Sequence, residues 1–381
     1  MAKVHITLVG GQPAPVYKGI IDEHPDTVIL VCSNDSVELA GNVQKYACEK
    51  IDGLQCEQVQ ISPVSIPEIR KKINKIASSL SGDDIVTVNI SGGTKVWSIL
   101  FYDSFKDKAD CIFIDQNDNK YNLTTELSKS IYVQLDIKTI LGLNYIDFTS
   151  HSLTEYSEED FKAAQTVRDM RRRFPVNFNK LMDDVENHPG AGYWCIDDLN
   201  YLSYNKNEKT CTMSLSNNRR NKVEKKKISS PHIQKVMFNT GWFELEVAKM
   251  LSQWEHAQEI AMNCYLRSSK EKNSLTLNEI DIIINVHEKL LFVECKTQIK
   301  DATDVDKFNN AIRLYGGLSA KGVFVTDAEM KPQAKAKCDT AGILTFSMQK
   351  LRETGNVDIQ KLFKELMFNE IDKHMGGLNI R

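Results

Sequence analysis

The fold of the C-terminal half is decided by residues 278–296, which read NEIDIIINVHEKLLFVECK. Two apolar runs, Ile282–Ile284 and Leu290–Val293, flank a short polar turn at His287–Lys289. This pattern predicts two buried strands paired in an antiparallel hairpin. Acids and a lysine stand at the strand ends, where a lone buried charge is destabilising unless something neutralises it. A divalent metal ion would neutralise them.

The predicted pairing brings the acids together. Strand residues match across a hairpin by constant index sum, so a turn centred at 287–288 puts Asp281 opposite Glu294. Side chains alternate faces along a strand, so Lys296 and Glu279 share that face, whereas Cys295 lies on the other. Carboxylates beside one ammonium suit a hard cation such as Mg²⁺ or Mn²⁺, with room for water and a phosphate. Lys296 would orient or deprotonate the attacking water and stabilise the charge of the pentavalent phosphorane.

This hairpin resembles the PD-(D/E)xK nuclease superfamily, with Asp281 as the first acid and Glu294-Cys295-Lys296 as the ExK element. In that superfamily an acid often precedes the hairpin on a helix, and an amphipathic helix predicted from Gly241 to about Trp254 carries Glu244. The resemblance implies catalytic roles for Glu244, Asp281, Glu294 and Lys296, and a metal site built from Asp281, Glu294, Cys295 and Glu244. The alternative is a solvated charge pair at a sheet edge.

Length and composition exclude several classes of protein. A chain of 381 residues predicts two or three domains, and a formal net charge of −3 argues against a histone-like polycation. Nine cysteines without a CxxC pair argue against a zinc ribbon and favour a reducing compartment. No signal-peptide pattern opens the sequence and no apolar run approaches about 20 residues. We therefore expect a cytoplasmic protein that does not contact a membrane.

Residues 1–148 alternate apolar strands with helical segments, which predicts a Rossmann-like parallel sheet covered on both faces. The predicted strands are Val4–Val9, Thr27–Cys32, Gln55–Ile61, Ile85–Ile90 and Cys111–Ile114, and the predicted helices are Ser36–Ile51, Ile66–Leu80 and one after Gly93. Ligands of such sheets bind beyond the carboxyl ends of the strands.

Three polar loops follow strands of this sheet. They are Gly10-Gly11-Gln12-Pro13, the loop that begins Ser33-Asn34, and Ser91-Gly92-Gly93-Thr94-Lys95. In the last loop, paired glycines let backbone amides approach a phosphate, and a helix N-terminus, a hydroxyl and an ammonium favour the anion. The loop is neither a Walker A motif nor GxGxxG. Together the loops predict a site for a phosphate-rich ligand, although any one of them alone is equally consistent with a tight turn.

These loops resemble the ligand loops of the CRISPR-associated Rossmann fold (CARF) family. The order of sensor, connector and nuclease motif is similar to that of the CARF nucleases of type III CRISPR defence, and the resemblance covers nearly the whole chain. It implies a homodimer whose paired sensor domains bind a cyclic oligoadenylate, most often cyclic tetra-adenylate, across the two-fold axis. Ligand binding would then reposition the nuclease domains. Degradation of the activator by the sensor is an open alternative.

The chain accordingly divides into a sensor at 1–148, a connector at 149–230 and a nuclease domain at 231–381. The connector is predicted to contain a helix at Glu158–Arg173 and short strands at Tyr193–Ile196 and Thr210–Leu215. Its basic run Asn217–Lys227 predicts an exposed linker or hairpin tip, with a contact to a nucleic-acid strand as the lesser alternative. The remaining predicted elements of the nuclease domain are Val305–Tyr315, Lys321–Val325, Ala328–Asp339, Ile343–Phe346 and a terminal helix, which give a mixed α/β fold like that of restriction endonucleases.

The sequence therefore predicts a metal-dependent nuclease that cleaves DNA, RNA or both, with single strands favoured, and that cyclic tetra-adenylate activates. Two alternatives remain at this point. One is a restriction or repair endonuclease with a different nucleotide-sensing domain, and the other is a ligand-responsive regulator without enzymatic activity.

Overall fold

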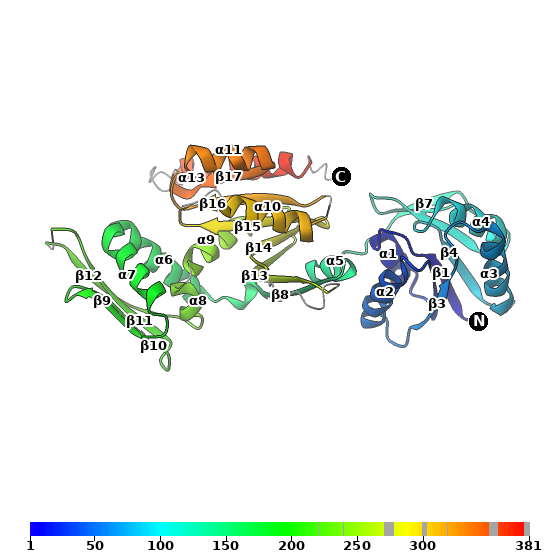
Figure 1. Ribbon diagram of the computed structural model, residues 1–381, viewed down its shortest axis with the longest axis horizontal. Coiled ribbons are helices and arrows are strands. Elements are labelled where there is room, and N and C mark those ends of the chain that lie inside the picture. The colour runs from blue at the N-terminus through cyan, green and yellow to red at the C-terminus, as the bar shows by residue number, and fades with distance from the viewer. Residues whose placement is uncertain are drawn as a thin grey trace. The chain divides into compact units, whose positions relative to one another are not determined.

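A computed structural model describes residues 1–219, 221–238, 240–269, 278–298, 303–317, 319–349 and 357–376. The chain forms two compact units (Figure 1). Unit 1 comprises Met1–Asp147 with a short segment that begins at Ser268, and unit 2 comprises Phe148–Arg267 and the described chain from Asn278 on. None of the described helices has the length and apolar character needed to span a membrane.

Unit 1 is built on a seven-stranded sheet in the order β3-β2-β1-β4-β5-β6-β7. Its strands are β1 (Lys3–Leu8), β2 (Thr27–Cys32), β3 (Gln55–Gln60), β4 (Ile85–Asn89), β5 (Asp110–Ile114), β6 (Asn119–Asn122) and β7 (Leu127–Ser130). The first five strands pair in parallel, and β6 and β7 extend the sheet antiparallel. This is the order of a Rossmann sheet, whose strand order reverses between β1 and β4. The predicted fold class is confirmed.

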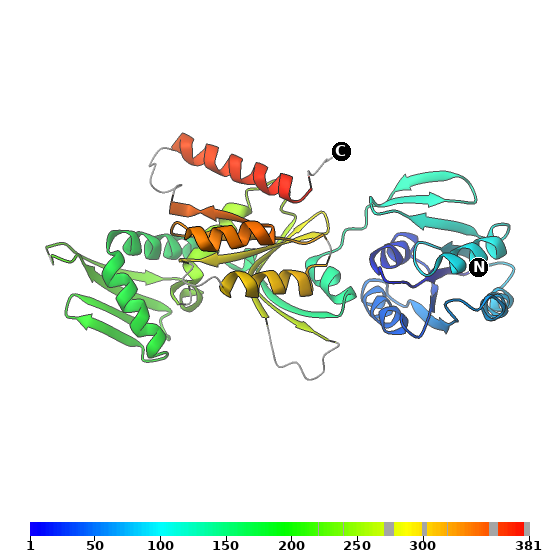
Figure 2. The ribbon, with the colours of Figure 1, turned by 45° about the horizontal axis from the view of Figure 1, so that its top comes forward.

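Helices cover both faces of this sheet (Figure 2). They are α1 (Ala14–Glu23), α2 (Val37–Lys50), α3 (Ile66–Ser79), α4 (Lys95–Phe105) and the short α5 (Ile137–Leu143). α1 and α2 share one apolar core with the sheet, and α3 and α4 share the other. The sequence did not predict α1, because the residues around its start, Gly11-Gln12-Pro13-Ala14-Pro15, are typical of a loop. Pro15 nevertheless fits the first helical turn, where no backbone N–H is needed.

Unit 2 contains a six-stranded mixed sheet in the order β17-β16-β15-β14-β13-β8. Its strands are β8 (Ile146–Ser152), β13 (Glu259–Ser268), β14 (Asn278–Val286), β15 (Lys289–Lys296), β16 (Lys321–Thr326) and β17 (Ile343–Ser347). β13, β14 and β15 pair antiparallel, whereas β15, β16 and β17 pair in parallel. The predicted mixed α/β fold is confirmed.

The predicted hairpin is present as β14 and β15. His287 and Glu288 form the two-residue turn, both with positive φ, 49° and 65°, as a type I′ turn requires. The paired residues run from Val286–Lys289 to Ile282–Val293. One further step in this register places Asp281 opposite Glu294, as the index sum predicted.

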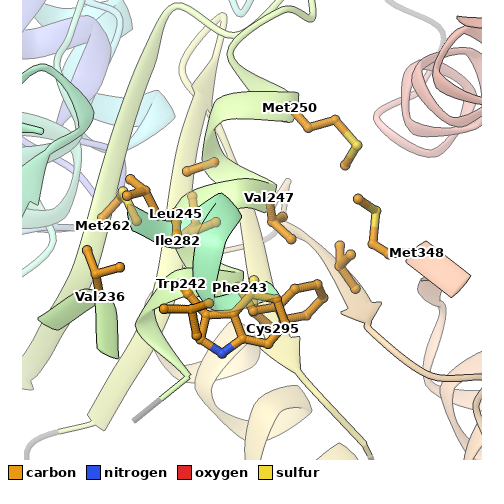
Figure 3. Packing of buried hydrophobic residues seen from close by; sticks show 14 of the residues in the cluster. Val236, Trp242, Phe243, Leu245, Val247, Met250, Met262, Ile282, Cys295 and Met348 are labelled. Atoms are coloured by element: carbon orange, nitrogen blue, oxygen red, sulfur yellow. The ribbon is translucent and has the colours of Figure 1, made fainter. Parts of the chain in front are cut away.

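Helices pack on both faces of the six-stranded sheet. They are α9 (Gly241–Leu251), α10 (Thr303–Tyr315), α11 (Pro332–Ala341) and α13 (Val357–His374). α6 (Glu158–Arg173), which follows a 3-10 turn at Leu153–Glu155, and α8 (Ile233–Met237) pack against α9. Figure 3 shows Trp242 and Phe243 of α9 in one apolar cluster with Ile282 and Cys295 of the hairpin. On the other face, Phe308 of α10 packs edge-on against Phe324, with ring centroids 4.8 Å apart. The helix predicted from Ala328 begins at Pro332, since proline favours the first turn.

A second, four-stranded antiparallel sheet in unit 2 has the order β12-β11-β10-β9. Its strands are β9 (Tyr193–Asp197), β10 (Asn200–Asn205), β11 (Thr210–Ser216) and β12 (Val223–Ser229), and α7 (Pro175–Asn187) packs on its inner face. The predicted helix Glu158–Arg173 and strands near Tyr193 and Thr210 are confirmed. The basic run is a hairpin tip only up to Lys222, because Lys225–Lys227 belong to β12; Arg220 lies outside the described residues.

Candidate functional site

The end of the β14–β15 hairpin carries three of the predicted site residues on one face. The backbone N–H of Cys295 donates a hydrogen bond of 2.7 Å to Oδ2 of Asp281, which fixes that carboxylate against the neighbouring strand. Nζ of Lys296 forms an ion pair of 2.7 Å with Oε1 of Glu294. The structure therefore brings Asp281, Glu294 and Lys296 together, as the alternation of strand side chains predicted.

Burial makes these carboxylates hard to ionise. The pKa of Asp281 is raised well above its usual value by burial, and the charges of Glu294 and Glu244 raise it further. Burial also raises the pKa of Glu294, although the Lys296 ammonium opposes this shift. Burial lowers the pKa of Lys296, but the carboxylates of Glu294 and Asp281 outweigh it and raise the pKa above its usual value. Lys296 is therefore a persistent cation, which suits charge stabilisation better than proton abstraction.

Glu244 reaches the site from the first turn of α9. Oγ1 of Thr240 donates to its Oε1 at 3.2 Å, and Nδ2 of Asn263 donates to its Oε2 at 3.0 Å. Burial raises the pKa of Glu244 to about 7, with a further contribution from Glu279. Glu244 acts on the pKa of Asp281, but both of its own oxygens are held by Thr240 and Asn263. It is therefore coupled to the hairpin acids through charge.

Asn263 is a site residue that the sequence did not reveal. In the β13–β14 ladder, Met262 pairs with Ile282 and Cys264 with Ile280, while Asn263 has a left-handed φ of 48°. The pairing of β13 with β14 is thus interrupted opposite Asp281, and the side-chain amide of Asn263 donates to Glu244. The hydroxyl of Tyr156 donates to Oδ1 of Asn263 at 3.2 Å, which orients that amide. A single neutral Asn outside any motif gives no sequence signal for this role.

The donor set fits a hard divalent cation. Among the described residues, Oδ1 of Asp281 and Oε2 of Glu294 have no hydrogen-bond partner, so one oxygen of each remains for an ion. A cation would also favour the ionised form that burial opposes. Within the described ranges, no group of three or more His, Cys, Asp and Glu side chains is arranged to hold a metal ion. Two carboxylates completed by water match the preference of Mg²⁺.

Cys295 contributes to this site through its backbone. Its side chain is 1% exposed and belongs to the apolar cluster beneath α9. Burial raises the pKa of the thiol well above its usual value, and the charge of Asp281 adds to the shift. A protonated, packed thiol is a poor ligand for a hard ion, so the peptide groups of Cys295 are the parts that can serve the predicted metal site.

In unit 1, two of the predicted ligand loops lie against each other. They follow β1 and β4, the strands on either side of the reversal in strand order. A Cβ added to Gly10 would stand 2.6 Å from the backbone N of Gly93, and one added to Gly92 would stand 2.1 Å from the carbonyl oxygen of Leu8. Only glycine permits this approach, so the two loops form one backbone surface.

Side-chain hydrogen bonds brace the loop after β4. Oδ1 of Asn89 accepts from the backbone N–H of Ser91 at 3.0 Å, and Oγ of Ser91 accepts from the backbone N–H of Ile114 at 2.7 Å. Thr94 caps α4 by accepting from the backbone N–H of Trp97 at 3.2 Å. Lys95, the first residue of α4, is exposed. The loop is thus a fixed turn that presents a helix N-terminus and one ammonium, as an anion site requires.

The third predicted loop borders a separate depression. Ser33 and Asn34 line a cavity of about 1020 Å³ together with Lys71, Lys72 and Lys75 of α3. The sequence did not connect these lysines with the loops, because their place beside the carboxyl end of β2 follows only from the packing of α3. The cavity adds positive charge to the same edge of the sheet.

Solved structures share this fold over most of the chain. Can2 from Sulfobacillus thermosulfidooxidans, solved in complex with cyclic tetra-adenylate, has a TM-score of 0.63 and 17% identity, covering 98% of this chain and 99% of that chain. Protein VC1899 from Vibrio cholerae has a TM-score of 0.68 and 14% identity, with coverage of 98% and 99%. A type III CRISPR defence DNA nuclease activated by cyclic oligoadenylate has a TM-score of 0.54 and 16% identity, with coverage of 87% and 46%.

Family models identify both functional parts of the sequence, although no curated protein matches it. Residues 4–142 match the Card1 CARF domain, which contains all three loops described above. Residues 232–344 match the Card1-like endonuclease domain, which contains Glu244 and the hairpin acids. The chain therefore contains a CARF domain of the Card1 type followed by a Card1-like endonuclease domain.

Proposed function

We propose that this protein is a divalent-metal-dependent endonuclease that hydrolyses phosphodiester bonds in DNA, RNA or both, with single strands favoured. Its sensor would span residues 1–148, its connector 149–230 and its nuclease domain 231–381. The observation that carries the proposal is the hairpin end, where two hard carboxylates with an oxygen available stand beside a persistent ammonium.

The catalytic roles follow from the chemistry of these groups. A bound Mg²⁺ or Mn²⁺ would supply an activated water and polarise the phosphate. Asp281 and Glu294 would hold that ion. Lys296 would orient the water and stabilise the negative charge that develops on the phosphate. Glu244, with a pKa of about 7, can exchange a proton near neutral pH.

We further propose that cyclic tetra-adenylate activates the enzyme in type III CRISPR defence by binding the CARF domains of a homodimer. The joined glycine loops, the capped α4 and the lysines of α3 provide backbone amides and cations for a ligand with several phosphates. Can2, which shares the fold, was solved with this ligand. A ring with two-fold symmetry suits two copies of one loop set at an isologous interface. Activation requires that the ligand contact the two states of the dimer differently.

One cleavage experiment tests these proposals together. The protein is incubated with Mn²⁺ or Mg²⁺, with and without cyclic tetra-adenylate, against plasmid, single-stranded DNA and RNA. We expect cleavage of a single-stranded substrate only when metal and activator are both present. Glu294→Gln and Lys296→Met should each abolish cleavage while leaving the affinity for cyclic tetra-adenylate unchanged.

The other outcomes separate the alternatives. Full cleavage without the cyclic oligonucleotide would indicate a restriction or repair enzyme with a different ligand. Absence of cleavage under all conditions, with intact ligand binding, would indicate a regulator without enzymatic activity.

A further inference from the structure

A large cavity in unit 2 adjoins the candidate active site. Its volume is about 900 Å³, within the range of about 300–1,000 Å³ that small-molecule sites occupy. Thr240 lines it and donates a hydrogen bond to Glu244, and Thr297, the residue after Lys296, lines it as well. The cavity is therefore bordered by direct neighbours of two proposed catalytic residues.

Aromatic rings form several of its walls. Tyr204 of β10 meets Phe238 edge-on, with ring centroids 5.5 Å apart and an interplanar angle of 78°. Trp194 of β9 lies 5.6 Å from the same ring at 58°. Trp242 of α9 contributes a fourth ring. Tyr204 and Phe238 are only partly buried, so their ring surfaces remain available to a flat ligand.

The charges on the lining argue against a phosphate in this cavity. The lining carries two cations, Lys206 and Arg171, and two acids, Asp183 and Glu186, so their formal charges cancel. The Arg171 guanidinium also forms an ion pair with Asp327 and lies over the ring of Trp242, 5.5 Å from the centroid. The lining therefore favours a neutral group, and a phosphate is better accommodated beside the Lys296 ammonium.

Amide groups complete the lining. Gln234 of α8 accepts a hydrogen bond from the hydroxyl of Tyr204 at 3.4 Å and is exposed, and Asn179 of α7 also lines the cavity. Amides both donate and accept, as the edge of a nucleobase requires. Flat rings, amides and no net charge are together the features of a base-binding pocket.

We infer that this cavity is a subsite for one nucleobase of the single-stranded substrate, next to the scissile phosphate. The inference rests on the proposed nuclease function and specifies how the substrate is held. The base stacks against Tyr204 and Phe238, and its edge meets Gln234 or Asn179. Because a base in a duplex is not available for such stacking, the subsite also explains a preference for single strands.

The test uses full-length protein with Glu294→Gln, so that binding is measured without cleavage. The probes are single-stranded DNA and RNA oligonucleotides that carry 2-aminopurine, whose fluorescence is quenched on stacking. Tyr204→Ala, Phe238→Ala and Gln234→Ala remove cavity groups. Tyr201→Ala is the matched control, because Tyr201 lies on the same strand with its ring stacked on Tyr193, outside the cavity.

We expect quenching in the parent, and affinity about 5- to 150-fold lower in Tyr204→Ala and Phe238→Ala, since stacking on one aromatic ring contributes about 1–3 kcal/mol. Tyr201→Ala should keep the parent affinity. Gln234→Ala, an exposed change that leaves the core intact, should also weaken binding if the aromatic variants fail to fold.

Unchanged affinity in the cavity variants, or an equal or larger loss in Tyr201→Ala, would overturn the inference and place base binding on the outer face of the four-stranded sheet. These outcomes are measured by binding alone, so they are distinguishable from a failure of the cleavage assay. Failure of the wild-type protein to cleave would contradict the nuclease proposal, while the quenching experiment would still decide whether the cavity binds a base.

Discussion

The backbone N–H of Cys295 donates a 2.7 Å hydrogen bond to Oδ2 of Asp281, just beyond Ile282–Val293, the last residue pair of the β14–β15 ladder. This bond replaces the next rung of the ladder with a side chain, so the orientation of the carboxylate is set by the sheet itself. On the other side of β14, Asn263 has a left-handed φ, and the β13–β14 pairing is interrupted opposite Asp281. Asp281 is thereby held by the backbone of β15 before any ion binds.

The contact between Asn263 and Glu244 predicts a test of positioning. Asn263→Gly preserves the left-handed backbone but removes the amide that holds Oε2 of Glu244. Loss of such an orienting contact typically reduces metal affinity or activity about 10- to 100-fold. We expect this loss in the single-turnover cleavage rate, with unchanged affinity for cyclic tetra-adenylate. A normal rate in Asn263→Gly would show that the amide does not position Glu244.

The raised pKa of Glu244 predicts a pH-dependent stability. Burial raises this pKa from 4.5 to about 7, so the folded state binds a proton more tightly than the unfolded state. The contribution of Glu244 to stability is therefore greatest below about pH 4.5 and declines as the pH rises to about 7. A shift of this size corresponds to about 3 kcal/mol.

Denaturant unfolding in chelator-treated buffer measures this effect. The free energy of unfolding of Glu244→Gln, relative to wild type, should increase by about 3 kcal/mol between pH 5 and pH 8. The comparison with the variant removes contributions from other acids. A difference that does not change with pH would mean that the carboxyl of Glu244 titrates normally.

The contact between the glycine loops predicts loss of ligand binding in Gly92→Ala. The added Cβ would stand 2.1 Å from the carbonyl oxygen of Leu8, so one of the two loops must move. We expect cyclic tetra-adenylate binding to fall at least 10-fold in calorimetry. Gly82→Ala is the matched control, because its Cβ meets nothing within 4 Å and it precedes β4 at the other edge of the sheet. Equal affinities in the two variants would count against the loops as the ligand site.

The hairpin turn offers a stabilising substitution away from the chemistry. Glu288 has a φ of 65°, which disfavours residues with a Cβ and favours glycine in a type I′ turn. Glu288→Gly should raise the free energy of unfolding by about 0.5–1 kcal/mol, since relief of backbone strain exceeds the entropic cost of glycine. Cleavage should be unchanged. Destabilisation in urea unfolding would show that the side chain of Glu288 outweighs the strain.

Much of the site's local geometry was predictable because strand pairing is a local rule. The index sum and the alternation of side chains sufficed to place Asp281, Glu294 and Lys296 on one face, and the alternation of strands and helices sufficed for the parallel sheet. Contacts between distant segments were not predictable. The amide of Asn263, the hydroxyl of Thr240 and the lysines of α3 reach their positions only through tertiary packing.

Two strands of the four-stranded sheet could not be predicted from the sequence either. β10 and β12 are rich in Asn, Ser, Tyr and Lys, so they lack the clear alternation of apolar and polar residues from which a strand is predicted. The cavity beside the active site depends on this sheet, on α7 and on the start of α9 together. No motif in the sequence marks it.

Calorimetric titration of Mn²⁺ into the chelator-treated protein tests the central claim most directly, which is that Asp281 and Glu294 hold a metal ion beside Lys296. We expect saturable binding in the wild type, loss of that binding in Asp281→Ala and in Glu294→Ala, and retention in Glu370→Gln, an exposed acid on α13. Equal Mn²⁺ binding in all four proteins, or none in the wild type, would contradict the claim.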